Sequence, residues 1–387
     1  MVDVIVVGAG VVGSSIAFHL AEEGTSVLQL DPTGGFGGQT PRSGAIVRSH
    51  HANLVEADLA WESLTSYYET WDQRVGGSCG FTHTGFAYLA DDGDERAVRA
   101  NVAKLREQGI DNELLSPDQL REREPSVTSE GISAVAYDRR GGYADPTATT
   151  LSLQQAARRH GARVERRRVL ALTERDGAIA GVRTDQGAVD AAVVVLAVGA
   201  WSPELTATVG LELPVHPARI QVMLFERPYD LPTHLTMTDV AHDVYLRPTA
   251  ERCTLVGRHA PEREWLSEPD GFRGEPDASF VAEGRARLGR RIPALAHAPY
   301  RLGRACALDL TPDGRPILGP SDCDGLYLAT GWSGGGFAKA PAVGAELARW
   351  ITTGAPARKE LTAFTLDRFT TGNLITAEHE YGATGPH

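Results

Sequence analysis

Lysine is nearly absent from this chain of 387 residues, in which it occurs only at Lys104, Lys339 and Lys359. The 50 acidic residues exceed the 38 lysines and arginines, so the formal net charge is −12. A protein that binds nucleic acid needs a basic face to neutralise phosphates. The charge balance therefore argues against a nucleic-acid partner.

Cysteine is also scarce, and long apolar runs are missing. The four cysteines have no C-x-x-C spacing and no nearby histidine pair, so we predict no metal site, no iron–sulfur cluster and no disulfide framework. An apolar run such as 191–198 has the length of a strand and is far shorter than the roughly twenty residues that span a membrane. No basic segment with a cleavage site precedes the first apolar run. We therefore expect a cytoplasmic protein without a membrane partner.

The first 31 residues follow the pattern strand, glycine turn, helix and strand. A β-branched run is followed by Gly8, Gly10 and Gly13, which have the G-x-G-x-x-G spacing. Gly8 allows a tight turn, Gly10 lets the backbone approach a pyrophosphate, and Gly13 lets the helix lie close to the strand. Asp31 closes the second strand, where an acid accepts hydrogen bonds from an adenosine ribose. The pattern predicts a dinucleotide fold for NAD or FAD rather than NADP.

Hydrophobic periodicity predicts further helices and strands along the chain. Helices are expected over 55–71, 97–108, 147–160 and 279–289, and after a glycine turn within 331–354. Strands are expected over 85–89, 133–137, 222–226, 243–247, 253–258 and 325–330. Between 162 and 202 the chain is typical of a strand, a hairpin that turns at Asp176–Gly177, and a buried strand that ends at Gly199. The polar tail after about Thr371 is the one part where disorder is expected.

These elements divide between two interleaved domains of an α/β protein. A nucleotide-binding domain is expected from segments 1–80, 141–213 and 303–371. A second domain, with an antiparallel sheet that covers the substrate, is expected from 81–140 and 214–302, and 372–387 forms the tail. Such interleaving excludes a dehydrogenase built from two consecutive domains.

Six blocks in order resemble the D-amino acid oxidase superfamily of FAD-dependent amine oxidoreductases. They are the N-terminal glycine motif, TPRSGAIVRSHH (40–51), GGYADP (141–146), LAVGAWS (196–202), TPDGRPILG (311–319) and LATGWSGGGF (328–337). Among these, S-G-A-I-V-R and G-W-S-G-G-G-F resemble the sarcosine oxidase branch. The resemblance implies a Rossmann-type, glutathione-reductase-like FAD domain. It also implies oxidation of an amine carbon–nitrogen bond to an imine by hydride transfer to flavin N5, in an N-methyl, cyclic imino or D-configured amino acid.

The glycine-rich turn at 331–336 suits the pyrimidine end of a flavin. Backbone N–H groups and a helix N-terminus there stabilise the negative charge that forms on reduction. A flexible surface loop is the alternative. The residues that the resemblance assigns to the cofactor are Gly8, Gly10, Gly13, Asp31, Ser43, Gly44, Val169, Gly199, Cys306, Gly331, Gly334, Gly335, Gly336 and Phe337.

Cys306 lies seven residues before Asp313, at the position where sarcosine oxidase and some relatives carry a cysteine bonded to the flavin 8-methyl carbon. The resemblance therefore implies FAD that is covalently attached through Cys306. Ala307 and Leu308 depart from the covalent enzymes, which have an aromatic residue at the second place. A small buried packing residue is the alternative role for Cys306.

The resemblance also implies residues that act on the substrate. Arg48 matches the arginine that holds the substrate carboxylate, a task that suits a guanidinium fork, and a phosphate or domain-interface role is the alternative. Tyr245 and His259 match two further active-site positions, where the histidine polarises groups or carries protons unless it is a core histidine. Arg247 is a candidate clamp for an acid group if the strand keeps it on the face of Tyr245.

Two departures from the family concern lysine. The family lysine of the last loop is Ala338 here, with Lys339 displaced by one residue, so Lys339 either reaches the site as a catalytic residue or caps a surface. The lysine that promotes oxygen attack falls near Leu255, which leaves open whether oxygen or another electron acceptor is used. A flavin hydroxylase that uses NAD(P)H and a flavin-carrying subunit of a larger assembly are further alternatives.

Overall fold

The computed structural model describes residues 2–260 and 262–381. One layer of the molecule is a six-stranded sheet in the order β20-β21-β13-β1-β2-β9. Its strands are parallel except for β20, which runs antiparallel to β21. The bounds are β1 (Val4–Val7), β2 (Val27–Leu30), β9 (Arg163–Glu165), β13 (Val193–Leu196), β20 (Ile317–Pro320) and β21 (Leu326–Thr330). This sheet confirms the predicted Rossmann-type architecture.

Both faces of this sheet are covered, as the apolar run of β1 predicts. Because side chains alternate along a strand, Val4 and Val6 join the core that contains α1 (Val11–Glu22), α6 (Pro146–Arg159) and α9 (Gly336–Thr353). Ile5 and Val7 join the core on the other face. That face is covered by α7 (Ser202–Thr206) and by a sheet of β10 (Val169–Arg175), β11 (Ala178–Thr184) and β12 (Gly187–Asp190).

The hairpin between β10 and β11 turns at Asp176–Gly177, as predicted. Asp176 and Gly177 have φ values of 55° and 83°, the conformation of a type I′ turn. The third strand, β12, was not predicted. The predicted strand end at Gly199 is wrong, because β13 ends at Leu196 and Gly199 begins the 3-10 helix η3 (Gly199–Trp201).

The second layer is a nine-stranded sheet in the order β18-β14-β17-β16-β15-β5-β7-β6, with β19 paired to β14. β15 and β5 run parallel, and the other pairs run antiparallel. Helix α8 (Ala278–Arg291) packs on β14, β16 and β17, while α4 (Glu95–Glu107) and α5 (Pro117–Arg123) lie beside β6 and β7. The bounds are β5 (Phe86–Ala90), β6 (Glu113–Leu115), β7 (Ala134–Asp138), β14 (His216–Glu226), β15 (Thr236–Asp239), β16 (Val244–Pro248), β17 (Cys253–Gly257), β18 (Glu264–Trp265) and β19 (Tyr300–Leu310).

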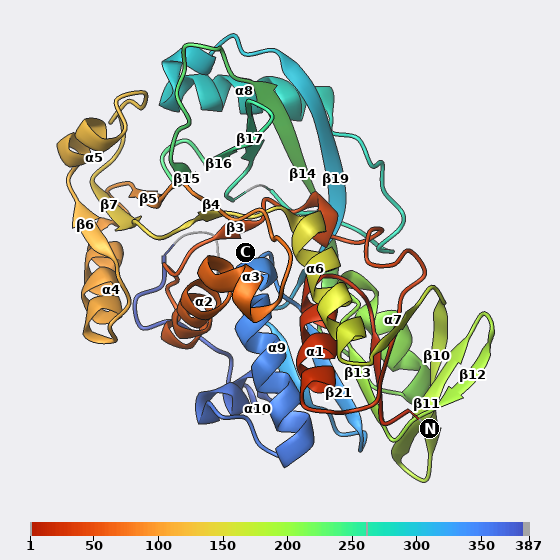
Figure 1. Cartoon of the computed structure of the whole chain (residues 1–387). Helices are drawn as coiled ribbons and strands as arrows, with labels where there is room; N and C mark the ends of the chain where they lie inside the picture. Colours follow the sequence, from red (N-terminus) through yellow and green to blue (C-terminus); the bar gives the residue numbers. More distant parts are fainter. Residues whose placement is uncertain (1, 261, 382–387) are drawn as a thin grey trace.

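A long ribbon of β14 and β19 connects the two layers (Figure 1). Each strand has 11 residues, and their pairing runs from Phe225↔Tyr300 to His216↔Leu310. At its far end, Asp309 of β19 contacts the turn that follows β21 of the parallel sheet. The expected boundary at residue 303 therefore falls inside β19.

The remaining elements complete the fold. A short sheet consists of β3 (Ile46–Val47), β8 (Gly142–Tyr143) and β4 (Thr82–His83), and the shorter helices include α3 (Trp71–Arg74) and α10 (Arg368–Thr371). The helix predicted over 55–71 is wrong at its end, because α2 (Leu54–Ser66) stops before Tyr68, whose hydroxyl donates to the carbonyl oxygen of Phe337. None of the helices in the described ranges combines the length and apolar character that a transmembrane helix needs.

The segment 372–381 packs against the rest of the molecule. Tyr381 is 7% exposed, and the Ile375 N–H donates to the Asp313 carboxylate at 3.1 Å. The prediction of disorder after Thr371 is therefore wrong for these residues. Their contacts come from side chains far away in the sequence, which local composition does not report.

Candidate functional site

A cavity of about 640 Å³ lies between the two layers, at the carboxyl ends of the parallel strands. One wall includes Val7 of β1, Asp31 after β2 and Gly199 after β13. The other wall includes Tyr245 of β16 and Cys306 of β19. Ligands of open α/β sheets bind at this edge, so the cavity is the candidate site.

The glycine motif separates into two roles at the cavity. Gly8 has a φ of 103°, and a Cβ there would lie 2.3 Å from the carbonyl oxygen of Ala197. Gly8 and Gly10 line the cavity, whereas Gly13 does not. A Cβ at Gly13 would lie 2.2 Å from the Gly8 carbonyl oxygen. Gly13 thus lets α1 lie against β1, and the first two glycines leave backbone open to a ligand.

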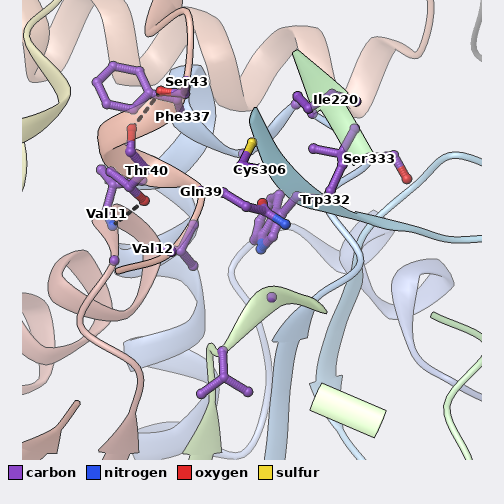
Figure 2. Close-up of a pocket in the computed structure, with 18 of the residues that line it drawn as sticks. Val11, Val12, Gln39, Thr40, Ser43, Ile220, Cys306, Trp332, Ser333 and Phe337 are labelled. Carbon is purple, nitrogen blue, oxygen red and sulfur yellow. Dashed lines mark hydrogen bonds between the residues drawn. The ribbon is translucent and has the colours of Figure 1, made fainter. Parts of the chain in front are cut away.

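The N-terminus of α1 opens on the cavity and is fastened to a turn that the sequence did not single out. Gly10 is the N-cap and offers no side chain, but Thr40 Oγ1 accepts a hydrogen bond from the Val11 N–H at 3.2 Å (Figure 2). Ser43 Oγ donates to the Thr40 carbonyl oxygen at 2.9 Å. Thr40 could have been found from the sequence, because it begins the block 40–51 that resembles the family. Other N–H groups of the first helical turn are available to an anion.

Asp31 lines the cavity where the sequence predicts a ribose. One carboxylate oxygen accepts from the Ala9 N–H at 3.1 Å. The other accepts from the N–H groups of Thr33 and Gly35 at 2.7 and 3.0 Å. These bonds hold the carboxylate beside the β1–α1 turn. Val169 of β10 lines the same cavity.

The glycine-rich turn before α9 reaches the cavity with only part of its length. Gly334, Gly335, Gly336 and Phe337 line the cavity, and no side chain caps the helix N-terminus. Gly331 does not line it, which corrects the prediction that this residue contacts the cofactor. The reason is that the Gly331 and Trp332 N–H groups point to the buried carboxylate of Asp309, at 2.8 and 3.0 Å.

Asp309 was missed by sequence reasoning. It is fully buried on β19, and burial raises the pKa of its carboxyl group. Its Oδ1 atom has no hydrogen-bond partner among the described residues. Asp309 therefore acts as an internal anchor that ties β19 to the turn after β21.

Cys306 lies on β19 with its side chain at the cavity and is 5% exposed (Figure 2). Burial raises the pKa of its thiol to about 12, so the free group is a neutral thiol at pH 7. The Gln39 side-chain amide donates to the carbonyl oxygen of the next residue, Ala307. Within the described residues, 2–260 and 262–381, no group of three or more His, Cys, Asp or Glu side chains is arranged to hold a metal ion.

Arg48 follows β3 and lines the cavity without a charged partner. Its guanidinium makes no hydrogen bond or ion pair with any residue in the described part of the chain, and it lies 5.1 Å from the ring centre of Phe86. Burial lowers the pKa of Arg48, yet an arginine stays charged at physiological pH. The site therefore contains a partly buried cation that has no hydrogen bond or ion pair among the described residues.

Tyr245, His259 and His51 also line the cavity. The Tyr245 ring packs against Gly257, where a Cβ would lie 2.2 Å from it, so the lack of a side chain at Gly257 makes room for the ring. Burial raises the pKa of the Tyr245 hydroxyl. Burial lowers the pKa of both histidines, and in each the Nε2 atom has no partner among the described residues. The sequence analysis assigned no role to His51. Its position three residues after Arg48 could have indicated that it lies near the site.

Arg247 does not line the cavity. It shares a strand face with Tyr245, but its guanidinium donates to the carbonyl oxygens of Gly44 and Pro248 and lies 4.6 Å from the Tyr143 ring centre. Arg247 thus fixes Gly44 at the cavity wall. The hypothesis that it clamps an acid group of the ligand is wrong for this arrangement.

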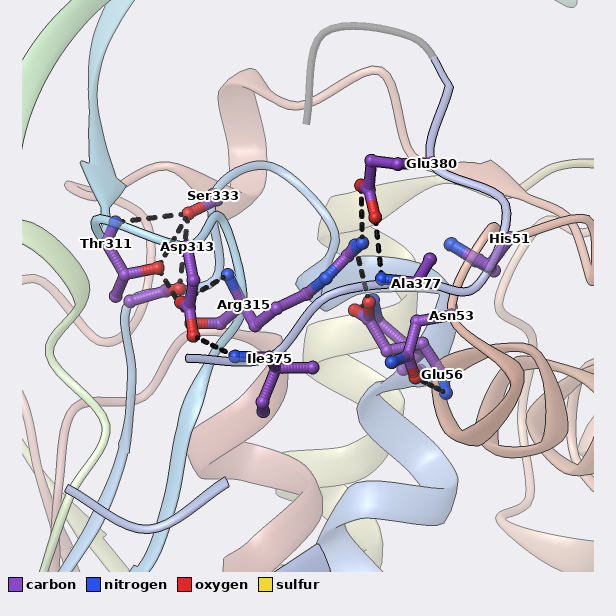
Figure 3. A network of polar contacts seen from close by, with 12 residues as sticks. His51, Asn53, Glu56, Thr311, Asp313, Arg315, Ser333, Ile375, Ala377 and Glu380 are labelled. Atoms are coloured by element: carbon purple, nitrogen blue, oxygen red, sulfur yellow. Dashed lines mark hydrogen bonds and ion pairs between the residues drawn. The ribbon is translucent and has the colours of Figure 1, made fainter. Parts of the chain in front are cut away.

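Lys339 also lies outside the cavity, which corrects its prediction as a catalytic residue. Its ammonium pairs with Glu56. Glu56 in turn pairs with Arg315 at 2.8 Å (Figure 3). One residue along a helix rotates a side chain by about 100°. Ala338 therefore occupies the cavity wall, and Lys339 turns into the protein interior.

Comparisons with known proteins agree with this geometry. The family model described as DAO, FAD dependent oxidoreductase, matches residues 3–350. The chain is 30% identical over 369 residues to the 4-methylaminobutanoate oxidase (formaldehyde-forming) of Paenarthrobacter nicotinovorans, a match that covers 92% of this chain and 44% of that protein. It spans less than half of that relative. It is 27% identical to sarcosine oxidase subunit beta of Rhizobium meliloti (strain 1021), covering 96% of this chain and 89% of that subunit.

Solved structures give the same result. L-proline dehydrogenase from P. horikoshii superposes with a TM-score of 0.88 at 25% identity, covering 97% of this chain and 99% of that one. Glycine oxidase from Geobacillus kaustophilus superposes with a TM-score of 0.82 at 23% identity, over 95% and 98% of the two chains, which supports the fold. With a family model matched over residues 3–350, this chain belongs to the DAO family of FAD-dependent oxidoreductases.

Proposed function

We propose that FAD lies along this cavity. The fit rests on two helix N-termini, those of α1 and α9, which open on the cavity and whose N-cap residues, Gly10 and Gly335, have no side chain. Each offers N–H groups and a positive dipole end to phosphates or to an anionic part of the flavin. The nucleotide would contact Gly8, Gly10, Asp31 and Val169, and the flavin would lie beside Ser43, Gly44, Gly199, Cys306, Gly334, Gly335, Gly336 and Phe337.

We also propose the domain division that follows from this placement. The six strands of the first sheet all fall within 1–80, 141–213 and 303–371, which would form the FAD domain. Segments 81–140 and 214–302 contribute most of the nine-stranded sheet and would form the substrate domain. Limited proteolysis with and without FAD tests this division, because bound FAD should protect the first set of segments.

The function that the site supports best is oxidation of an amino acid at the carbon that carries its amine. Bound FAD supplies the acceptor for the hydride. The observation that carries this proposal is Arg48, a cation on the cavity wall with no hydrogen bond or ion pair among the described residues. A desolvated charge without a partner is costly, and a guanidinium binds a carboxylate in a bidentate manner. The carboxylate of the substrate is therefore the expected partner.

The names of the relatives narrow the substrate class. 4-Methylaminobutanoate, sarcosine and L-proline are each secondary amines with a carboxylate. Our proposal for this chain is thus an N-methyl or cyclic imino acid, with a D-amino acid as the wider alternative.

His259 and Tyr245 would manage protons near the amine. Burial lowers the pKa of His259, so its ring is neutral at pH 7 and able to accept a proton. Burial raises the pKa of Tyr245, which keeps its hydroxyl as a donor. A neutral substrate amine is needed to release a hydride, and these neutral groups do not compete with Arg48 for the carboxylate.

The electron acceptor is a separate question, and we propose an acceptor other than oxygen. Arginines supply the cations that line the cavity, and our proposal assigns Arg48 to the substrate carboxylate. No lysine is among the described lining residues, and Leu255 lies buried in β17 outside the cavity. A cation near the reduced flavin stabilises the negative charge that oxygen acquires. Comparing turnover with oxygen and with an artificial dye tests this point, and separation of cell fractions tests the predicted cytoplasmic location.

Anaerobic reduction of the flavin tests the function. We expect sarcosine, L-proline or 4-methylaminobutanoate to bleach the visible flavin absorbance of the purified holoenzyme. Arg48→Met should raise the substrate concentration for half-maximal reduction about 100-fold, since hydrogen bonds to a charged group are lost. Arg99→Met, on the exposed side of α4, is the matched control. Half-saturation of Arg48→Met at the wild-type concentration would contradict the role of Arg48.

A further inference from the structure

The C-terminal segment 375–381 contacts two other parts of the chain. Glu380 accepts a hydrogen bond from Arg315 at 2.9 Å, and Arg315 also pairs with Glu56 (Figure 3). The hydroxyl of the next residue, Tyr381, contacts His50 Nε2 at 2.7 Å. His50 is separated from Tyr381 by 331 positions in the sequence and is two residues from Arg48.

Tyr381 begins a chain of hydrogen bonds whose direction can be worked out. Asn101 Nδ2 donates to the Tyr381 hydroxyl oxygen at 2.7 Å, and the Tyr381 hydroxyl donates to His50 Nε2. His50 Nε2 is then the acceptor nitrogen, and Nδ1 carries the proton that is donated to Asn112 Oδ1 at 2.9 Å. Burial lowers the pKa of His50 to about 3, which agrees with a neutral ring.

The chain continues to a buried acid. Asn112 Nδ2 donates to Ser49 Oγ at 3.2 Å, and Ser49 Oγ donates to Asp138 Oδ2 at 2.7 Å. The Ser49 N–H donates to the same Asp138 oxygen at 2.7 Å. The side chains of Ser49, His50 and Asp138 are fully buried. The donor and the acceptor of each hydrogen bond are thus fixed, so these side chains have a single set of orientations. The series consists of Asn101, Tyr381, His50, Asn112, Ser49 and Asp138.

This arrangement bears on Arg48 because Arg48 has no hydrogen bond of its own among the described residues. Its backbone is continuous with Ser49 and His50, which the chain locks. The Tyr381 ring also packs against Tyr88, at 5.2 Å between ring centres, and Tyr88 lies 6.1 Å from His259. Tyr381 thus supports two residues that line the cavity.

We propose that Tyr381 is a positioning residue that holds Arg48 in place for the substrate carboxylate, acting through His50. The inference rests on the proposed function of Arg48. Tyr381 would thereby influence substrate affinity, although it is far from Arg48 and from the glycine motif in the sequence. Loss of the hydroxyl leaves His50 Nε2 without its donor and frees the segment that carries Arg48.

Tyr381→Phe in the full-length holoenzyme tests the proposal, because the ring that packs on Tyr88 is kept. Acetate serves as the carboxylate probe, and its binding is followed by the change in flavin absorbance. We expect Tyr381→Phe to weaken acetate binding and raise the KM of the amino acid about fivefold to tenfold, since one buried hydrogen bond is lost. The rate constant of flavin reduction at saturation should stay within about twofold. Tyr327→Phe, whose hydroxyl has no hydrogen bond in the described ranges, is the control.

The outcomes separate the two proposals. If wild-type protein binds acetate, Arg48→Met does not, and Tyr381→Phe binds it as wild type does, the positioning role is overturned while the carboxylate site stands. If Tyr381→Phe loses flavin, or lowers kcat as much as it raises KM, its role is structural and the inference is also overturned. If the wild-type holoenzyme binds no acetate, the carboxylate site itself is wrong, and the role of Tyr381 is overturned with it.

Discussion

At the residue scale, Gly13 shows how the absence of a side chain sets a distance. A Cβ at Gly13 would lie only 2.2 Å from the Gly8 carbonyl oxygen. Backbone atoms cannot yield as a flexible side chain does, so α1 would have to move away from β1. Because Gly10 caps the same helix, such a shift also displaces the N-terminus that faces the cavity.

Gly13→Ala should therefore lower both stability and FAD affinity. Overpacking of this kind costs about 1–3 kcal/mol in the free energy of unfolding. Urea denaturation and the flavin content of the purified protein measure the two effects. Gly274→Ala is the matched control, since nothing lies within 4 Å of a Cβ there. Equal flavin content in the two variants would be evidence against the role of Gly13.

Cys306 allows a second residue-scale prediction. Its place on the cavity wall supports a bond to the flavin, which would be retained when the protein is precipitated with acid. We expect a yellow pellet from wild-type protein and a colourless pellet from Cys306→Ser. Cys323→Ser, outside the cavity lining, should resemble wild type. A colourless wild-type pellet would assign Cys306 to packing alone.

At the scale of elements, helix α8 is joined to the nine-stranded sheet by its last residue. Arg291 is fully buried and donates through Nε and Nη2 to the two oxygens of Asp239, at 2.7 and 3.0 Å. Asp239 is the last residue of β15. Arg291 also donates to the carbonyl oxygen of Glu130 at 3.1 Å, so one guanidinium holds a helix, a strand and a loop.

Arg291→Ala should be among the most destabilising single substitutions in the layer that contains the nine-stranded sheet. It removes the guanidinium that pairs with the buried Asp239 carboxylate and leaves that carboxylate with its hydrogen bonds from His242, at a cost of about 3–5 kcal/mol. Chemical denaturation gives the change in the free energy of unfolding. Arg290→Ala, one residue earlier and exposed, should change it by less than about 0.5 kcal/mol. Similar values for the two variants would show that the buried pair contributes little.

At the scale of the whole molecule, buried histidines link stability to pH. Burial lowers the pKa of His19 to about 4, of His50 to about 3 and of His234 to about 4. An unfolded histidine has a pKa near 6.5, so the unfolded chain binds more protons than the folded chain below that pH. The stability that these neutral rings contribute is present above about pH 6.5 and is lost as the pH falls toward 4.

The free energy of unfolding should therefore fall between pH 7 and pH 5. Each such histidine contributes up to about 1.4 kcal/mol per pH unit within this window. Urea titrations at the two pH values measure the change. His19→Gln should reduce the slope, whereas His83→Gln, at an exposed position, should not. A pH-independent midpoint would contradict the buried, neutral state of these rings.

Much of the parallel layer was predictable because its signals are local. The glycine spacing at 8–13, the apolar run of β1 and the Asp176–Gly177 turn each depend on residues close together in the sequence. The short strand β15, Thr236–Asp239, was missed because four residues with no alternation carry little pattern. It is a strand because it pairs with β5 and β16, which lie elsewhere in the chain.

The sequence by itself therefore determined the nucleotide fold, the family and the N-terminal glycine motif, since backbone conformation and motif spacing are local properties. Only the tertiary structure decided which charged groups face the cavity. Lys339 turns inward to Glu56, the N–H of Gly331 donates to Asp309, and Arg48 has no ion pair within the described part of the chain. Tyr381 meets His50 across 331 positions. Such contacts depend on how helices and sheets pack, because burial makes each polar group find a partner wherever the fold brings one close.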